Sequence, residues 1–243
     1  WKGNLVLAVN ESKIILLNTK ENASAFGRIS ASTNPTKNQS KPVGGLLSTL
    51  HDCLNNTFLD MQFGSCTLSE MALAAQHIKT YCENYVAKAI FTFDCGYPSM
   101  RLIDQLLQQK QYFLFRVSSV FLKAYMDQVQ DGEDRLFEVT FDRKTTNHYR
   151  EDIRFRQHLM NTTYQLWFIK IIIGKDIVEY LISNLPMNEY SIDDLKELYH
   201  LRWTIETSYN RLKNRIKLEE FRGFKEILIS SIRVFMQIYG CIT

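Results

Sequence analysis

The chain has 243 residues, of which 45% are hydrophobic and 23% charged, a composition that suits one large globular domain or a domain with an insertion. A formal net charge of +3 does not by itself demand a nucleic-acid partner, and five cysteines without a CxxC pair argue against a disulfide framework or a zinc ribbon. No apolar run approaches the ~18 residues of a membrane span, so a cytoplasmic protein is expected, without a membrane partner. Because it starts without a methionine and stops in an apolar stretch, we expect a piece of a longer protein.

Apolar runs in the first quarter of the chain predict β-strands. Strands are expected at 5–9 and 14–17, and a hairpin is expected from the runs 46–52 and 57–63. The Ser-, Thr-, Asn- and Lys-rich stretch 18–42 predicts a loop. Three early antiparallel strands follow from this pattern.

The next stretch alternates between helical and strand patterns. A helix is expected at 69–85, with Ser69 as its N-cap, and is followed by an apolar strand at 89–93. A second helix is expected from about 98 to 109, and a second buried strand at 112–117. Such alternation predicts an α/β sheet with parallel members.

Residues 118–183 show a different pattern, without a strong helix. Four β ribbons separated by polar turns are expected there, at 136–141, 152–157, 164–173 and 177–182. We therefore predict a core whose first part is 1–117, a β-rich insertion at 118–183, and a final part of the core at 184–243.

The last predicted helix begins after Ser191 and runs to about Leu218. At 100° per residue, four of its side chains fall within about 60° of one another: Tyr199, Arg202, Glu206 and Lys213. Between Tyr199 and Lys225, seven basic residues stand against three acidic ones, which suits contacts with phosphates. A solvated helix flank, on which Glu206 merely pairs with neighbouring cations, is the alternative.

Polar residues end the two strongest predicted strands. Asn10 and Asp94 occupy these ends, and open α/β sheets bind ligands at the carboxyl ends of parallel strands. Gly96 and Pro98 predict a tight turn after Asp94 that holds its carboxylate at the sheet edge. The alternative for Asp94 is an acid without a function, present only because the chain leaves the core at this point. The chain has no P-loop, no nucleophile elbow and no metal-ligand spacing among its histidines.

Three blocks resemble the IS4-type insertion-sequence transposases, a branch of the DDE transposases. They are AVNESKI (8–14), FDCGYPS (93–99) and YHLRWTIETSYNRLK (199–213), with NLP (184–186) ahead of the last. The resemblance implies a ribonuclease-H-like α/β fold, a mixed sheet flanked by helices, with a β-rich insertion before the catalytic helix.

The resemblance also implies metal-dependent DNA cleavage and strand transfer at transposon ends. The catalytic positions would be Asp94, Glu206 and Asn10, with Asp94 and Glu206 as ligands of two Mg²⁺ or Mn²⁺ ions. The DNA-binding positions would be Tyr199, Arg202, Trp203 and Lys213. The implied partners are double-stranded DNA, both transposon ends and target, and a second subunit in a dimer on DNA, in the nucleoid of a bacterial cell.

Two residues depart from the family pattern. Asn10 stands where the family has its first catalytic aspartate, and Cys95 stands where an arginine is usual. An amide offers a neutral oxygen in place of an anion, so metal affinity and activity are expected to fall. Glu11 points to the opposite face of its strand and Asp52 ends a neighbouring strand, so neither is expected to compensate. An introduced substitution and the decay of a transposon copy both remain open as the origin of Asn10.

Two other functions remain open from the sequence: a non-catalytic, transposase-derived DNA-binding protein, and a generic ribonuclease-H-like nuclease. An unrelated α/β domain would separate Asn10, Asp94 and Glu206. A shared metal site requires their oxygens within about 10 Å of one another, because paired ions lie only ~4 Å apart.

Overall fold

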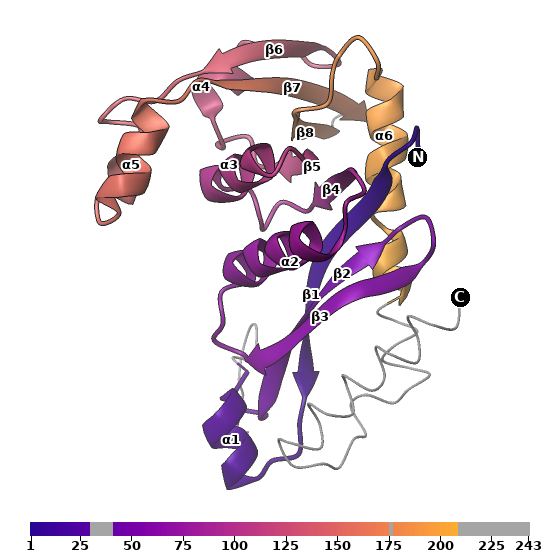
Figure 1. Ribbon diagram of the computed structural model, residues 1–243, viewed down its shortest axis with the longest axis vertical. Helices are drawn as coiled ribbons and strands as arrows, with labels where there is room; N and C mark the ends of the chain where they lie inside the picture. The colour runs from indigo at the N-terminus through magenta and orange to yellow at the C-terminus, as the bar shows by residue number, and fades with distance from the viewer. Residues whose placement is uncertain (30–40, 175–176, 209–243) are drawn as a thin grey trace.

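The computed structural model describes residues 1–29, 41–174 and 177–208. Its strands form one eight-stranded mixed sheet in the order β3-β2-β1-β4-β5-β8-β7-β6, with helices packed against it (Figure 1). The predicted α/β class, a mixed sheet flanked by helices, is confirmed. None of the helices in the described part of the chain is long and apolar enough to cross a membrane.

The first three strands are antiparallel, as predicted. They are β1 (Leu5–Ile15), β2 (Gly44–Asp52) and β3 (Thr57–Ser65). The prediction of separate strands at 5–9 and 14–17 was wrong, because the polar residues between them stay paired with β2, with Asn10 opposite Thr49. Backbone hydrogen bonds hold this part of β1 without apolar side chains.

A short helix, α1 (Lys20–Phe26), lies within the predicted loop 18–42. The Thr19 hydroxyl accepts a hydrogen bond from the Asn22 backbone N–H, which caps the helix. Phe26 is buried in the sheet core, with its ring centroid 5.1 Å from that of Phe63. One buried ring and one cap therefore give helical structure to a segment whose composition is that of a loop.

The parallel part of the sheet confirms the predicted alternation. β4 (Ala89–Phe93) runs parallel to β1 and to β5 (Tyr112–Val117). The helices α2 (Glu70–Asn84) and α3 (Met100–Gln108) follow β3 and β4 and begin after the N-caps Ser69 and Ser99.

The segment after β5 is β-rich but contains helices that the sequence did not predict. Its elements are α4 (Lys123–Met126), β6 (Asp134–Val139), η1 (Asn147–Tyr149), α5 (Ile153–Met160), β7 (Tyr164–Ile173) and β8 (Ile177–Ser183). The predicted strand 152–157 was wrong: Asp152 accepts a hydrogen bond from the Phe155 N–H and caps α5. β8 pairs antiparallel with β5, so this segment extends the core sheet.

The last described helix, α6 (Ile192–Leu201), is shorter than predicted. After Leu201 the backbone tightens, because Arg202 N–H bonds to Tyr199 O and Trp203 N–H to His200 O, before helical structure resumes at 204–208. The remainder of the predicted helix, including Lys213, lies outside the described residues.

The two faces of the sheet have separate cores. On one face, Val6 and Ala8 of β1 pack in a cluster with Leu195 and Leu198 of α6. On the other face, Leu7 and Val9 lie with α2 and α3. Since side chains alternate along a strand, Asn10 belongs to the face of α6 and Glu11 to the face of α2.

Candidate active site

Asp94 directly follows β4 and turns its carboxylate toward solvent. Its backbone C=O accepts a hydrogen bond from Tyr97 N–H at 3.1 Å, and its Oδ1 accepts one from Cys95 N–H at 2.7 Å. The turn leads into α3 at Ser99. The Asp94 side chain is 42% exposed at this edge, open to a ligand from solvent.

Side chains of the α6 segment meet this carboxylate. Tyr199 Oη donates a hydrogen bond to Asp94 Oδ1 at 3.2 Å. Arg202 Nη2 lies 3.9 Å from Asp94 Oδ2 and 3.2 Å from Glu206 Oε1. One guanidinium nitrogen thus contacts both carboxylates, so Asp94 and Glu206, far apart in the sequence, converge at one edge of the sheet.

The Arg202 and Tyr199 side chains are buried at this edge, whereas the two carboxylates are exposed. The Arg202 side chain is only 4% exposed, whereas the Glu206 side chain is 54% exposed. Arg202 Nε is buried and has no hydrogen-bond partner among the described residues. Burial raises the pKa of Tyr199 to about 12, against the opposing charge of Arg202, so the hydroxyl stays protonated and donates to Asp94. A buried cation and a buried donor therefore lie beneath two exposed carboxylates.

Asn10 lies on the same edge and the same face as Asp94. β1 and β4 run parallel with Ala8 opposite Thr92, so Asn10 and Asp94 each lie two residues further along their strands. The side chain at this position is the neutral amide noted in the sequence. The strand register thus places Asn10 beside Asp94, at the edge where the α6 segment contacts Asp94.

Arg116 of β5 also lies at this edge, although no sequence motif marked it. Arg116 Nη1 lies 3.6 Å from Asp94 Oδ1, and its Nε lies 3.3 Å from Glu179 Oε1 on β8. Burial acts to lower the pKa of Arg116, but the charge of Glu179, with Tyr199 and Asp94, raises it above its usual value. A lone arginine in the apolar run YFLFRV was the signal that could have found it.

Glu11 and Asp52 make other contacts. Burial raises the pKa of Glu11 to about 8, and Glu70 at the start of α2 and Asp94 contribute to the rise, so Glu11 is protonated at neutral pH. Asp52 Oδ1 accepts hydrogen bonds from Leu54 N–H and Asn55 N–H at 2.9 and 3.1 Å, which close the β2–β3 hairpin.

The oxygen atoms at this edge suit a hard divalent cation. Mg²⁺ is usually held by one or two carboxylates together with substrate phosphates and water, and Asp94 and Glu206 offer such a pair. Within the described ranges no group of three His, Cys, Asp or Glu side chains could hold a metal ion. Any cation held by Asp94 and Glu206 would need further ligands from water or substrate.

Comparison with known proteins decides the family. The family model of the transposase DDE domain matches residues 27–234. The chain belongs to this family. The match includes Asp94, Tyr199 and Glu206, whereas Asn10 precedes it. A search of curated proteins returns no match.

A solved transposase shares the fold. The chain is similar to a structure described as a piggyBac transposase synaptic complex with hairpin DNA, with a TM-score of 0.54 and 13% sequence identity. The similarity covers 86% of this chain and 40% of that one, so the present chain spans less than half of the other protein. The ribonuclease-H-like fold expected from the three sequence blocks agrees with this likeness.

Proposed function

We propose that this chain is the catalytic domain of an IS4-type DDE transposase, which cleaves double-stranded DNA at transposon ends and transfers strands to a target. The observation that carries the proposal is the contact of one Arg202 nitrogen with both Asp94 and Glu206. The Arg202–Glu206 contact is an i,i+4 pair that a solvated helix flank would also show, so the Arg202–Asp94 contact is the one that joins Glu206 to the end of β4. Membership in the transposase DDE domain family supports the same reaction class.

In this proposal Asp94 and Glu206 are ligands of Mg²⁺ or Mn²⁺, with two ions in an intact site. When bound, such an ion would supply a more acidic water or DNA 3′ hydroxyl and positive charge near the leaving oxygen. Tyr199 holds Asp94 in one orientation through its 3.2 Å hydrogen bond, and Arg202 keeps the two carboxylates together. These contacts organise the site before substrate arrives.

The DNA contacts proposed for this region are Tyr199, Arg202, Trp203 and Lys213. Trp203 is 55% exposed and can stack on a base or pack on a sugar. Tyr199 and Arg202 are almost fully buried beside Asp94, so we assign them to a phosphate that reaches the carboxylates themselves. A dimer on DNA, working at the nucleoid of a bacterial cell, completes the proposal.

Asn10 impairs the enzyme in this proposal. A carboxylate at this position would add a third negative charge beside Asp94 and Glu206, whereas the amide supplies only a neutral oxygen. Lower metal affinity and little or no turnover are therefore expected of the unmodified chain.

Restoring the carboxylate tests both claims. Asn10→Asp should cleave and join a plasmid that carries the DNA flanking the gene, with Mg²⁺ or Mn²⁺, while the unmodified chain should not. Adding Glu206→Gln to the Asn10→Asp variant should abolish the reaction, and calorimetry with Mn²⁺ should show tighter binding after Asn10→Asp alone.

Each other outcome has a definite meaning. Cleavage by the unmodified chain would show that the view of Asn10 is wrong. Absence of both metal binding and cleavage after Asn10→Asp would overturn the enzymatic proposal and leave a non-catalytic DNA-binding protein. Equal cleavage of a plasmid without the flanking DNA would point to a general nuclease.

A further inference from the structure

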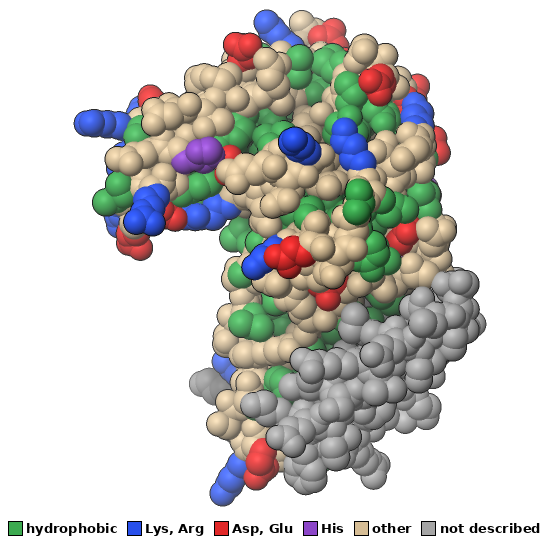
Figure 2. All heavy atoms as spheres, in the orientation of Figure 1, with side chains coloured by type: hydrophobic (Ala, Val, Ile, Leu, Met, Phe, Trp, Pro, Cys, Tyr) green, Lys and Arg blue, Asp and Glu red, His purple; other side chains and the backbone are tan. Residues whose placement is uncertain are grey.

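A cationic segment lies at the outer end of the β-rich segment. Residues 142–158, which include η1 and α5, contain five Lys or Arg residues and three Asp or Glu residues. This excess of two positive charges compares with +3 for the whole chain. α5 projects from the rest of the molecule at the upper left of Figure 1, and blue Lys and Arg side chains surround this projection in Figure 2.

Two of the three acids in this segment are engaged within it or with α3. Asp142 Oδ1 accepts hydrogen bonds from the backbone N–H of Lys144 and of Thr145, at 2.9 and 2.8 Å. Asp152 caps α5 and pairs at 2.7 Å with Arg101 of α3. The hydrogen bonds from backbone N–H groups lower the pKa of both carboxyls, so both stay ionised in these roles.

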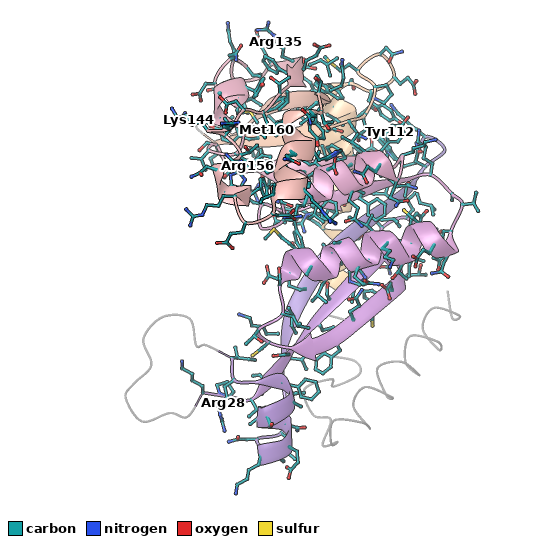
Figure 3. All side chains as sticks on the ribbon, turned by 60° about the vertical axis from the view of Figure 1, so that its left-hand side comes forward. Arg28, Tyr112, Arg135, Lys144, Arg156 and Met160 are labelled. Carbon is teal, nitrogen blue, oxygen red and sulfur yellow. The ribbon has the colours of Figure 1, made fainter. Side chains whose placement is uncertain are left out.

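The cations divide into one that holds the structure and four that face solvent. Arg156 Nη2 donates to Arg143 O at 2.8 Å and its Nε to Thr146 Oγ1 at 3.2 Å, which fastens the 142–146 loop to α5. The exposed tip cations are Arg143, Lys144, Arg150 and Arg154. None of these four forms a salt bridge with another described residue. Figure 3 labels Lys144 and Arg156 in this region, far from Arg28 at the other end of the molecule.

Contacts with α3 fix this region near the edge that carries Asp94. Arg101 lies in the first turn of α3, just after the turn that follows Asp94. Its guanidinium lies 4.3 Å from the ring centroid of Phe155 and 5.4 Å from that of Tyr149. One turn further along α3, Asp104 Oδ1 lies 2.7 Å from His158 Nε2. η1 and α5 are therefore held against the helix that starts at the candidate active site.

We propose that the tip cations bind the phosphate backbone of double-stranded DNA beside the cleavage site, as a second contact surface separate from α6. This inference rests on the proposed function, because it takes DNA as the substrate. Lys144 and Arg154 interact electrostatically with Asp142 and Asp152, but none of the four tip cations is held in a salt bridge to a described residue. All four can therefore neutralise phosphates without reading sequence. Their rigid attachment to α3 places them beside the same duplex that would reach Asp94.

The test measures binding of the full chain to a labelled DNA duplex by fluorescence anisotropy at several salt concentrations. Lys144, Arg150 and Arg154 are replaced by Ala together, and Arg143 is kept so that the 142–146 loop, which Arg156 fastens to α5, is changed at one position only. We expect at least a tenfold loss of affinity, and a fall of about 2 to 3 in the slope of log K against log salt, since each lost phosphate contact removes about 0.9.

A charge-matched control replaces three exposed lysines on other elements, Lys20, Lys79 and Lys123, by Ala. Binding and slope should change little in this control, and a variant with Arg150→Lys and Arg154→Lys should keep most of the affinity. Circular dichroism of each variant checks that the fold is unchanged.

The outcomes separate this inference from the proposed function. If the unmodified chain binds duplex DNA and the triple variant keeps the same affinity and slope, the tip surface is refuted while the proposed function stands. If the control loses as much as the triple variant, the effect is one of net charge and the inference fails. If the unmodified chain binds no duplex at all, both proposals fail.

Discussion

At the scale of single residues, one carboxylate organises the candidate site. Asp94 has Tyr199, Arg202 and Arg116 within 3.2, 3.9 and 3.6 Å, respectively. Both arginines also contact a second acid, Glu206 or Glu179. Each arginine is therefore shared between two acids. A divalent cation or a phosphate could replace one of these contacts, and the arginine would still be paired with the other acid.

Glu11 makes a testable contribution to pH dependence. Its pKa is raised from 4.5 to about 8, first by burial and then by Glu70, so the folded state holds a proton that the unfolded chain has lost. The free energy of unfolding should therefore fall as pH rises from about 4.5 through about 8, on the order of 1 kcal/mol per pH unit. Glu11→Gln, which mimics the protonated form, should flatten this fall in urea melts at pH 6 and pH 8.5.

The exposed Glu83, which pairs with Lys79 on α2, provides the control. Glu83→Gln should leave the pH dependence as it is. If Glu11→Gln left the fall between pH 6 and pH 8.5 intact, another group would be responsible for it.

At the scale of elements, the α6 segment depends on its two ends. Near its beginning, Ser191 Oγ accepts from Asp194 N–H at 3.2 Å, and Asp194 Oδ2 accepts from Ser191 N–H at 2.8 Å. Near its end, backbone hydrogen bonds between residues three apart form a 3₁₀ turn. Because residues three apart align in such a turn, Arg202 lies on the same side of the helix as Tyr199. Both side chains can therefore reach Asp94.

Loss of the cap should destabilise the protein measurably. Ser191→Ala removes the hydroxyl acceptor and should lower the free energy of unfolding by about 1 kcal/mol, measured by urea denaturation. Ser191→Asn, which restores a capping oxygen, should recover most of the loss. An equal loss in both variants would mean that the hydroxyl has another role.

At the scale of the whole molecule, the β-rich segment shares its sheet and its core with the rest. β8 pairs with β5, and Trp167 of β7 is buried in the same cluster as Val6 and Leu198. Because the two parts share a sheet and a buried cluster in the described ranges, we expect one cooperative unfolding transition.

Native-state hydrogen exchange tests this expectation. The slowest amides of β1 and β7 should open with the same free energy. Trp167→Phe removes the 2.6 Å hydrogen bond from Nε1 to Asp134 and should lower both values together, by about 1–2 kcal/mol. A decrease confined to β7 would show that the two parts unfold separately.

Much of the fold was predictable because its signals are local. Apolar runs predicted the strands from β2 to β5, Ser69 and Ser191 placed the starts of α2 and α6, and the order of elements predicted a sheet with parallel members. The residues Asp94 and Glu206 were also identified from their own segments, one at a strand end and one on a helical stripe.

Other features depended on contacts between distant segments. β1 continues through polar residues because β2 pairs with them, α5 forms where Asp152 caps it and Arg101 holds it, and Arg116 meets Asp94 only because β4 and β5 are neighbours. The sequence by itself thus determined which segments form the sheet and which side chains have suitable chemistry. Only the tertiary structure decided that Asp94 and Glu206 share Arg202, because distances across a sheet arise from strand pairing and helix packing and leave no signal within a single segment.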